Sequence, residues 1–415
     1  MSLNQYSFNP PISRLSLVFD QPRRIIFGPD SVSQTGNEAS RLGGRNALLI
    51  TDENVERAGL SGRVQEAMEK SAVRVDIYDK ISFEPTMDSV QKAVQTARDA
   101  KAYDLIVGVG GGSVLDTSKM VANMLTNPGE PAHYLTPTED RFTKPSVPKI
   151  LIPTTAGTGS EVSNYSVVIE RQTMYKTWAA SSNLFADVAI VDPAMMISCP
   201  PRVTAGCSFD VAGHNIEGLI SAESTPISDG LAMEAVKLLF RHARKAYNKP
   251  DDIEARSGMA MASMLGGAVI AFPWIGGPAI LGHCLAEAFG PKYAVAHGVA
   301  VGLALPYILD FNLPACRDKV VSFAHSLGIE RDSDSADVVA NKVPQALLEL
   351  MRDVDLPTTL KQVNFPKGDL DGFAEYIFKE RQHVYGLPRY NPRRLTLENT
   401  TKLLHDMYEG ALEAR

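Results

Sequence analysis

Hydrophobic and polar positions follow two different patterns along this chain. In the first half, short apolar runs bounded by glycine, proline or aspartate alternate with segments whose apolar residues recur every three to four positions. The short runs are typical of buried strands and the longer periodic segments of amphipathic helices. We expect strands at 24–28, 47–52, 73–78 and 105–110, and helices at 30–42, 62–70, 88–100 and 114–125. This alternation predicts a mostly parallel α/β sheet with ligands at the carboxyl ends of its strands.

The alternation stops after about residue 193. Beyond residue 200 nearly every segment has a helical pattern, and we expect helices at 203–220, 229–248, 253–272, 278–289, 297–312, 319–327, 336–354, 369–380 and 396–414. The sequence Ser-Cys-Pro-Pro at 198–201 contains two prolines, which discourage the continuation of a strand or a helix. We therefore expect a boundary there, between an α/β domain over residues 1–198 and an all-helical domain over residues 199–415.

Composition describes a globular protein with room for two cores. Of its 415 residues, 44% are hydrophobic and 21% are charged. The formal net charge of −7 and the pI near 5.7 favour a small-molecule partner over nucleic acid or an anionic membrane. No apolar run approaches the roughly 20 residues that span a bilayer. Four cysteines without CxxC spacing indicate reduced thiols, and we expect a cytoplasmic protein.

A glycine-rich loop follows the expected strand at 105–110. It reads GGGSVLD over residues 110–116 and opens the expected helix at 114–125. Glycine lets backbone N–H groups approach a phosphate, and a helix N-terminus favours negative charge. We predict that a pyrophosphate binds at this loop. The alternative is a tight turn that needs glycine for its geometry alone.

Two further strand ends carry candidate binding groups. The sequence PTTAGTGSE at 153–161 follows an apolar run and is rich in hydroxyls and glycines, which favours contact with phosphate or ribose over a plain exposed turn. Asp52 ends the second expected strand, where a nucleotide-binding domain places an acid for ribose hydroxyls. Such an acid repels a 2′-phosphate and favours NAD over NADP. Asp52 can also act as a simple helix cap.

Candidate metal ligands lie in the helical half. Asp210 and His214 are four residues apart, which puts a carboxylate and an imidazole on one helix face. His283 lies in an apolar helical stretch, and a Gly-Pro pair interrupts the chain before His297 opens another, so the two histidines can lie side by side. One carboxylate and three imidazoles leave a divalent ion with an open coordination position. Alone, the Asp210–His214 spacing also fits a hydrogen-bonded pair.

Together these pieces resemble the iron-containing (group III) alcohol dehydrogenase family, which is related in fold to dehydroquinate synthase. The matching motifs are GGGSVLD at 110–116, PTTAGTGSEV at 153–162, AIVDP at 189–193, the Asp210/His214 pair, and the histidines at 283 and 297. The resemblance covers nearly the whole chain. It implies that residues 1–198 form a Rossmann-like dinucleotide-binding α/β domain and that residues 199–415 form an all-helical metal-binding and catalytic domain.

The resemblance also implies a site and a reaction. A divalent metal, Fe²⁺ with Zn²⁺ as the alternative, is expected to be held by Asp210, His214, His283 and His297. Contacts to NAD are expected from Asp52, Gly111, Gly112, Ser113, Asp116, Thr154, Thr155, Thr158, Lys176 and Leu184. The expected reaction interconverts an alcohol with an aldehyde or ketone, passing hydride between a metal-bound alkoxide and nicotinamide. Family members form dimers and larger assemblies, which implies a homo-oligomer.

Three positions depart from the family pattern, one of them Glu84, which stands where the family usually has the asparagine of an Asn-Pro-Thr turn near the cofactor. Glu287 stands where many members have another histidine that has been considered for proton relay, so Glu287, the cofactor ribose hydroxyls and a water chain are all open as the proton acceptor. Trp274 stands where members often have a smaller aromatic ring facing substrate. It either lines the substrate pocket or packs in the core.

Two other functions remain as alternatives. A hydroxyacid-oxoacid transhydrogenase with tightly held NAD would share the metal and cofactor motifs, but would form no NADH until an oxoacid acceptor was added. A non-catalytic nucleotide sensor that kept the fold would have no need of an open metal site, and the four intact ligand positions argue against it.

Overall fold

The computed structural model describes residues 17–82, 85–100, 102–136, 139–170, 175–272, 280–329 and 334–412. The chain divides into two compact units. The α/β unit contains Asp20–Pro200 and Lys249–Ala271, and the helical unit contains Pro201–Asn248, Phe272–Arg415 and the residues up to Phe19. The stretch Lys249–Ala271 thus belongs to the α/β unit, although it lies inside the range 199–415 that we predicted for the helical domain.

The α/β unit is built on one six-stranded sheet in which every neighbouring pair is parallel. The strand order is β1-β8-β5-β4-β2-β3. The strands are β1 (Ile25–Phe27), β2 (Asn46–Ile50), β3 (Arg74–Tyr78), β4 (Leu105–Gly110), β5 (Lys149–Pro153) and β8 (Val188–Val191). The predicted α/β class is confirmed.

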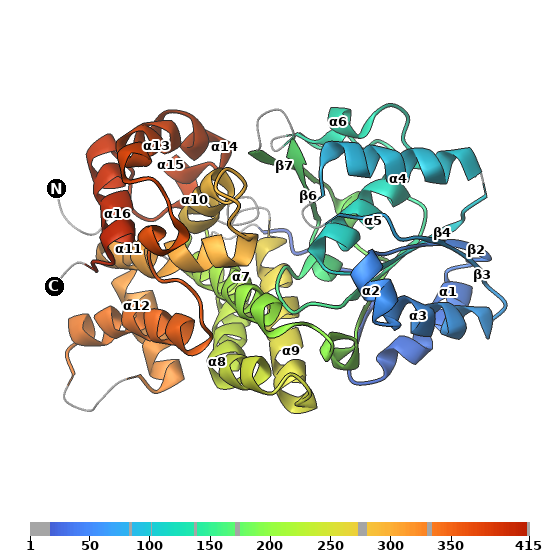
Figure 1. The fold of residues 1–415 in the computed structure, drawn as a ribbon, viewed down its shortest axis with the longest axis horizontal. Coiled ribbons are helices and arrows are strands. Elements are labelled where there is room, and N and C mark those ends of the chain that lie inside the picture. Colours follow the sequence, from blue (N-terminus) through green and yellow to red (C-terminus); the bar gives the residue numbers. More distant parts are fainter. Residues whose placement is uncertain are drawn as a thin grey trace. The chain divides into compact units, whose positions relative to one another are not determined.

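Helices cover both faces of this sheet (Figure 1). They are α1 (Thr35–Arg41), α2 (Glu53–Arg57), α3 (Leu60–Glu69), α4 (Met87–Ala100), α5 (Gly112–Met124) and the short α6 (Pro131–Tyr134). Side chains alternate along each strand, so Leu48 packs with α4 and α5 while Leu49 packs with α1 and α3. A strand buried on both faces reads as a continuous apolar run, which explains the short runs in the sequence.

Two features of the α/β unit were not expected from the sequence pattern, namely a hairpin and the packing of a predicted helix on this unit. The first is an antiparallel hairpin of β6 (Tyr165–Glu170) and β7 (Tyr175–Ala180), separate from the main sheet. The second is α9 (Ile253–Ile270), which packs on this unit through glycines. A Cβ atom added to Gly267 would lie 2.2 Å from the carbonyl oxygen of Gly159. Two glycines therefore allow the backbones of α9 and the loop after β5 to touch.

The helical unit confirms the predicted all-helical second half. Its helices are α7 (Pro201–Ile220), α8 (Pro226–Asn248), α10 (Leu281–Phe289), α11 (His297–Leu327), α12 (Ala336–Asp353), α13 (Leu370–Tyr376), α14 (Gln382–Val384), α15 (Leu387–Tyr390) and α16 (Leu397–Glu409). The expected helices at 297–312 and 319–327 form one kinked helix, with non-helical backbone at Cys316, two residues after Pro314. The segment Ile377–Arg381 after α13 is π-helical.

Helix α11 is long and apolar enough to cross a membrane by length and composition, and 83% of its most apolar window is buried inside the protein. Such burial is typical of the core helix of a globular domain. Its first turns lie very close to α7, because a Cβ atom at Gly298 would be 2.1 Å from the carbonyl oxygen of Gly206. This close approach brings the start of α11 beside the second turn of α7.

Candidate active site

The predicted metal ligands converge inside the helical unit. Asp210 and His214 lie one turn apart on α7, and His214 Nε2 is 3.7 Å from Asp210 Oδ1. His283 comes from α10, and His297 is the first residue of α11. The Nε2 atoms of His283 and His297 lie 3.5 and 3.4 Å from the same aspartate oxygen. One carboxylate oxygen therefore faces three imidazole nitrogens.

The imidazole rings gather closely around that oxygen. His214 stacks on His283 with ring centroids 4.8 Å apart, and the centroids of His283 and His297 are 5.3 Å apart. One ligand atom from each of Asp210, His283 and His297 can be chosen so that all three lie within 4.8 Å of one another. Only the His297 side chain keeps appreciable exposure, at 20%. Donor atoms this close suit a single small cation.

Two of these atoms are buried and lack hydrogen-bond partners within the described ranges, namely Asp210 Oδ1 and His283 Nε2. Orphaned buried polar atoms are unfavourable unless a bound group satisfies them. Burial alone would raise the pKa of Asp210, but the imidazoles of His214 and His297 hold it well below its usual value. Burial would lower the pKa of His283, yet the carboxylates of Glu217 and Asp210 raise it to about 10. Both pKa shifts indicate that this cluster of side chains stabilises a positive charge beside the Asp210 carboxylate.

Glu217 is a site residue that the sequence analysis missed. It is fully buried on α7, and its Oε1 lies 2.9 Å from His283 Nδ1. The signal was present, because Glu217 follows His214 by three residues and Asp210 by seven, and these spacings place all three on one face of a helix.

Of the three positions that depart from the family pattern, the structure describes Glu287, while Glu84 and Trp274 lie outside the described residues. Glu287 is 2% exposed on α10, one turn after His283, and its Oε2 has no hydrogen-bond partner in the part of the chain that the structure describes. The assignment of Trp274 to a substrate pocket stays a prediction.

The predicted cofactor loops lie at neighbouring strand ends of the α/β unit. The sheet order places β5, β4 and β2 side by side, and the order of strands reverses at β2, which makes a topological switch point. The loops also touch one another. Thr154 N donates to Gly110 O at 3.0 Å, and a Cβ atom at Gly112 would be 2.6 Å from Thr158 Cγ2. Glycine at position 112 thus leaves room for the threonine side chain.

Asp116, on α5, holds the loop at 153–161 and the β6–β7 hairpin in place. Its Oδ1 accepts from Ser160 Oγ at 2.5 Å, and its Oδ2 accepts from Val167 N at 3.0 Å. One turn later, Lys119 is fully buried and donates to Tyr165 O at 2.7 Å. Burial lowers the pKa of Lys119 to about 8 even though Asp116 opposes that change. These contacts of Asp116 and Lys119 therefore attach the loop at 153–161 and the β6–β7 hairpin to α5.

The other predicted cofactor residues lie at a helix cap, at the start of α5 and at buried positions of the α/β unit. Asp52 caps α2, with Oδ1 accepting from Asn54 N at 2.8 Å and Val55 N at 3.1 Å, so the helix-cap interpretation is confirmed and the ribose contact stays a prediction. Gly111 is the N-cap of α5, and Ser113 lies in its first turn. A Cβ atom at Gly111 would be 3.4 Å from Thr155 Oγ1. The remaining two residues are buried, Lys176 on β7 and Leu184 at the end of the 3₁₀ turn Ser182–Leu184.

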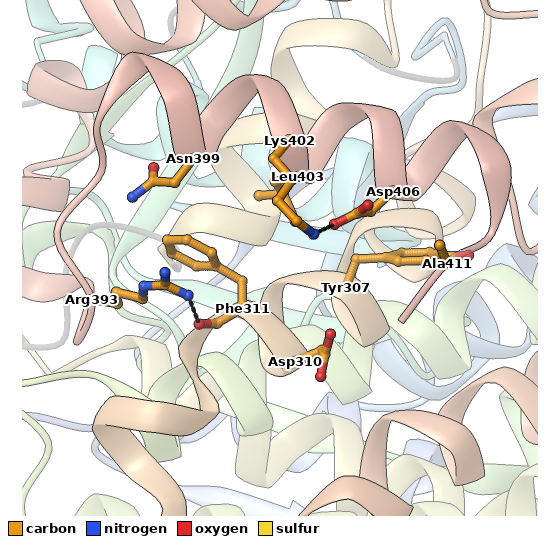
Figure 2. Close-up of a pocket in the computed structure, with 9 residues that line it drawn as sticks. All are labelled: Tyr307, Asp310, Phe311, Arg393, Asn399, Lys402, Leu403, Asp406 and Ala411. Atoms are coloured by element: carbon orange, nitrogen blue, oxygen red, sulfur yellow. Dashed lines mark hydrogen bonds and ion pairs between the residues drawn. The ribbon is translucent and has the colours of Figure 1, made fainter. Parts of the chain in front are cut away.

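A separate pocket in the helical unit contains none of the predicted site residues (Figure 2). It lies between α11, α16 and the turn that precedes α16. Arg393 donates to Phe311 O at 2.9 Å and lies 4.3 Å above the Phe311 ring, while Lys402 pairs with Asp406 at 2.5 Å (Figure 2). Arg393, Lys402 and Asp406 are thus engaged with neighbouring groups, and we assign this pocket no part in the chemistry.

Comparison with known families agrees with this geometry. The model described as iron-containing alcohol dehydrogenase matches residues 22–193, and that of the C-terminal Fe-containing alcohol dehydrogenase family matches residues 204–408. This chain belongs to the iron-containing alcohol dehydrogenase family. The resemblance drawn from the motifs is confirmed, and this family member is an oxidoreductase that acts on CH–OH groups.

Individual relatives cover nearly the whole chain. It is 35% identical over 366 residues to long-chain-alcohol dehydrogenase 1 of Geobacillus thermodenitrificans, covering 86% of this chain and 91% of that protein. The structure is similar to that of a 1,3-propanediol oxidoreductase, with a TM-score of 0.88, 28% identity, and coverage of 95% of this chain and 100% of the other. It is also similar to a sulfoacetaldehyde reductase from Bifidobacterium kashiwanohense in complex with NAD⁺, with a TM-score of 0.83, 27% identity, and coverage of 95% and 99%.

Proposed function

We propose that this family member interconverts an alcohol with its aldehyde or ketone, using NAD(H) and a divalent metal held by Asp210, His214, His283 and His297. The observation that carries the proposal is the close set of buried donor atoms, two of them without hydrogen-bond partners in the described structure. Three imidazoles and a carboxylate are ligands that both Fe²⁺ and Zn²⁺ accept. The family name favours iron, and the residues present fit either ion.

When bound, the ion supplies Lewis acidity toward the substrate oxygen and the NAD supplies the redox chemistry. The chain's own groups supply position and charge. The Asp210 carboxylate offsets part of the ion's charge, and burial of the surrounding side chains excludes bulk water. Glu287 Oε2 is buried and without a hydrogen-bond partner in the described structure, and we assign it to hold the proton that the alcohol gives up. We assign Trp274 to the substrate pocket.

For the cofactor, we propose binding at the carboxyl ends of β2, β4 and β5. The pyrophosphate is assigned to Gly111, Gly112 and Ser113 at the start of α5, where backbone N–H groups favour negative charge. Asp52 is assigned to the adenosine ribose and favours NAD over NADP. The remaining contacts are assigned to Asp116, Thr154, Thr155, Thr158, Lys176 and Leu184. In this division residues 1–198 bind the dinucleotide and residues 199–415 hold the metal.

The proposal extends to the cellular compartment, the partners and the oligomeric state of the protein. All four cysteines are free thiols, which suits a reducing compartment, and we assign the protein to the cytoplasm. The net charge of −7 offers no footprint for nucleic acid or an anionic membrane, so the proposed partner is a small alcohol or aldehyde. We further propose a homo-oligomer, which light scattering on the purified protein would test.

The direct test combines metal analysis with turnover. Protein purified without added metal is assayed for iron and zinc and then screened with alcohols and aldehydes, using NAD and NADP separately. We expect about one ion per chain and NADH formation from an alcohol without any other acceptor. NADH that forms only when an oxoacid is added would instead indicate a transhydrogenase. The variant His283→Ala should lose turnover and keep its NAD affinity, and equal loss of both would contradict the proposed division.

A further inference from the structure

Glu217 is a buried carboxylate that joins α7 to the start of α10. Its Oε2 accepts from Ile280 N at 2.9 Å, from Gly282 N at 3.0 Å and from His283 N at 3.3 Å. These N–H groups begin α10, whose own N-cap residue Ile280 makes no capping bond. Glu217 therefore caps α10 from another helix, at an end where negative charge is favoured.

The second oxygen of Glu217 fixes the His283 ring. Oε1 lies 2.9 Å from His283 Nδ1, and a carboxylate can only accept, so Nδ1 carries the proton and donates it. The opposite nitrogen, Nε2, then offers its lone pair when the ring is neutral. That nitrogen is the one that lies 3.5 Å from Asp210 Oδ1. The carboxylate thus selects the ring form that can bind a metal at this point.

Two glycines leave the space in which this contact forms. A Cβ atom at Gly282 would lie 2.5 Å from Glu217 Oε1, and one at Gly213 would lie 3.0 Å from His283 Cε1. Any side chain at either position would press on the carboxylate or on the ring. The arrangement therefore depends on the residues at 213, 217, 282 and 283 together.

We propose that Glu217 is a positioning residue for the metal site, acting through His283. This inference rests on the proposed function, because it concerns the same ion. The carboxylate orients the ring, sets its protonated nitrogen and adds a second negative charge close to the ion. With the charge of Asp210, it balances the two positive charges of a divalent cation in a fully buried environment.

The two-sided contact makes glutamine a disruptive replacement despite its equal size. In Glu217→Gln, the amide oxygen is needed at the Oε2 position, because backbone N–H groups point at it. The amide NH₂ then faces His283 Nδ1 and favours the ring form with the proton on Nε2, which blocks that nitrogen. Turning the amide around would instead set its NH₂ against the backbone N–H groups. Either orientation weakens metal binding.

The test compares metal affinity in three full-length proteins prepared free of metal. Zinc and cobalt are titrated against a chelator into wild type, Glu217→Gln and a matched control, Asp192→Asn. Asp192 is also a fully buried carboxylate that accepts backbone N–H bonds, from Asp30, Val32 and Ala194, but it belongs to the α/β unit. The control therefore loses a similar charge in a similar setting without touching a proposed ligand.

We expect Glu217→Gln to bind both ions about 10- to 100-fold more weakly than wild type and Asp192→Asn to bind them within about threefold. In the cobalt-loaded proteins, the exchangeable Nδ1 proton of His283 should give a strongly shifted resonance in wild type and in the control, and this resonance should be lost in Glu217→Gln. Gly282→Ala, which displaces Oε1 while keeping both partners, should weaken binding in the same direction and serves if Glu217→Gln does not fold.

The possible failures are distinguishable. Wild-type affinity and an unchanged cobalt spectrum in Glu217→Gln would overturn the assignment of Glu217 and leave the proposed function standing. Equal weakening in Asp192→Asn would also overturn it, because the effect would then belong to general loss of stability. Absence of metal binding by wild type would overturn the proposed function itself, and this inference with it.

Discussion

Replacing Gly159 by alanine would test whether α9 holds the threonine-rich loop of the α/β unit in place. Gly159 has a φ of +59°, and an added Cβ atom would lie 2.5 Å from Gly267 Cα and 2.6 Å from Ser263 O. Two penalties therefore coincide. Left-handed backbone costs an alanine roughly 1–2 kcal/mol, and overpacking against backbone that cannot rotate away costs roughly 1–3 kcal/mol. We expect a loss of about 4 kcal/mol in the free energy of unfolding.

Two matched variants separate the penalties. Gly43→Ala has a φ of +81° with nothing within 4 Å of the added atom, so it carries the backbone penalty alone, roughly 1–2 kcal/mol. Gly267→Ala carries the steric penalty alone, since its Cβ atom would meet Gly159 O at 2.2 Å. Its position inside α9 returns about 1 kcal/mol through helix propensity, which leaves a net loss of about 2 kcal/mol.

The assay is urea unfolding followed by the fluorescence of Trp178, which is buried in the hairpin of the α/β unit. The chain has two tryptophans, so a Trp274→Phe background makes Trp178 the only reporter. Gly159→Ala should also weaken NAD binding, because the displaced loop carries Thr154 and Thr158, and should leave metal content unchanged. A Gly159→Ala protein no less stable than Gly43→Ala would refute the packing argument.

Three other substitutions test separate parts of the account. Burial lowers the pKa of Lys119 to about 8 in the folded protein, so its buried charge destabilises the fold below that pH, and this penalty is relieved as the pH rises toward the unfolded value of 10.5. Relative to Lys119→Met, wild type should therefore gain about 2 kcal/mol of stability between pH 7 and pH 10. Equal pH profiles of the two proteins in urea unfolding would contradict this assignment. Asp52→Asn keeps a good helix cap and removes the negative charge, so the ratio of the NADP to the NAD dissociation constant should fall at least several-fold, whereas an unchanged ratio would remove Asp52 from the ribose site. Glu287→Gln should lower kcat by about 10²-fold or more with wild-type metal content, and an unaltered kcat would assign the proton to another group.

Much of the fold could be predicted because burial leaves a direct trace in the sequence. Strands such as β4 are enclosed on both faces and read as uninterrupted apolar runs. The hairpin of β6 and β7 was missed because it lies outside the parallel sheet, so the alternation of strands and helices did not include it. The pattern of α9 predicted a helix, but nothing in that pattern indicated that it packs with the α/β unit, since this contact is made by two glycines far apart in sequence.

The site was predictable to the extent that its chemistry depends on residue type. Asp210 and His214 have a helical spacing that can be read directly, and the Gly-Pro break between two helical stretches made His283 and His297 candidates. The resemblance then implied that all four bind one metal. Glu217 was missed because a buried glutamate is recognised by its partners, here the backbone N–H groups at the start of α10, and those partners lie more than sixty residues away in sequence. The spacing of Glu217 from Asp210 and His214 placed it on the same helix face, but the contact with α10 that gives it a role leaves no pattern in the sequence.

The central claim is that one ion is held by side chains from α7, α10 and α11. The most direct measurement is anomalous diffraction at the iron and zinc absorption edges, from crystals of active enzyme purified without added metal. The account predicts one strong peak per chain, within bonding distance of Asp210 Oδ1 and the Nε2 atoms of His214, His283 and His297. An active enzyme with no peak there, or with its metal bound by other residues, would contradict it.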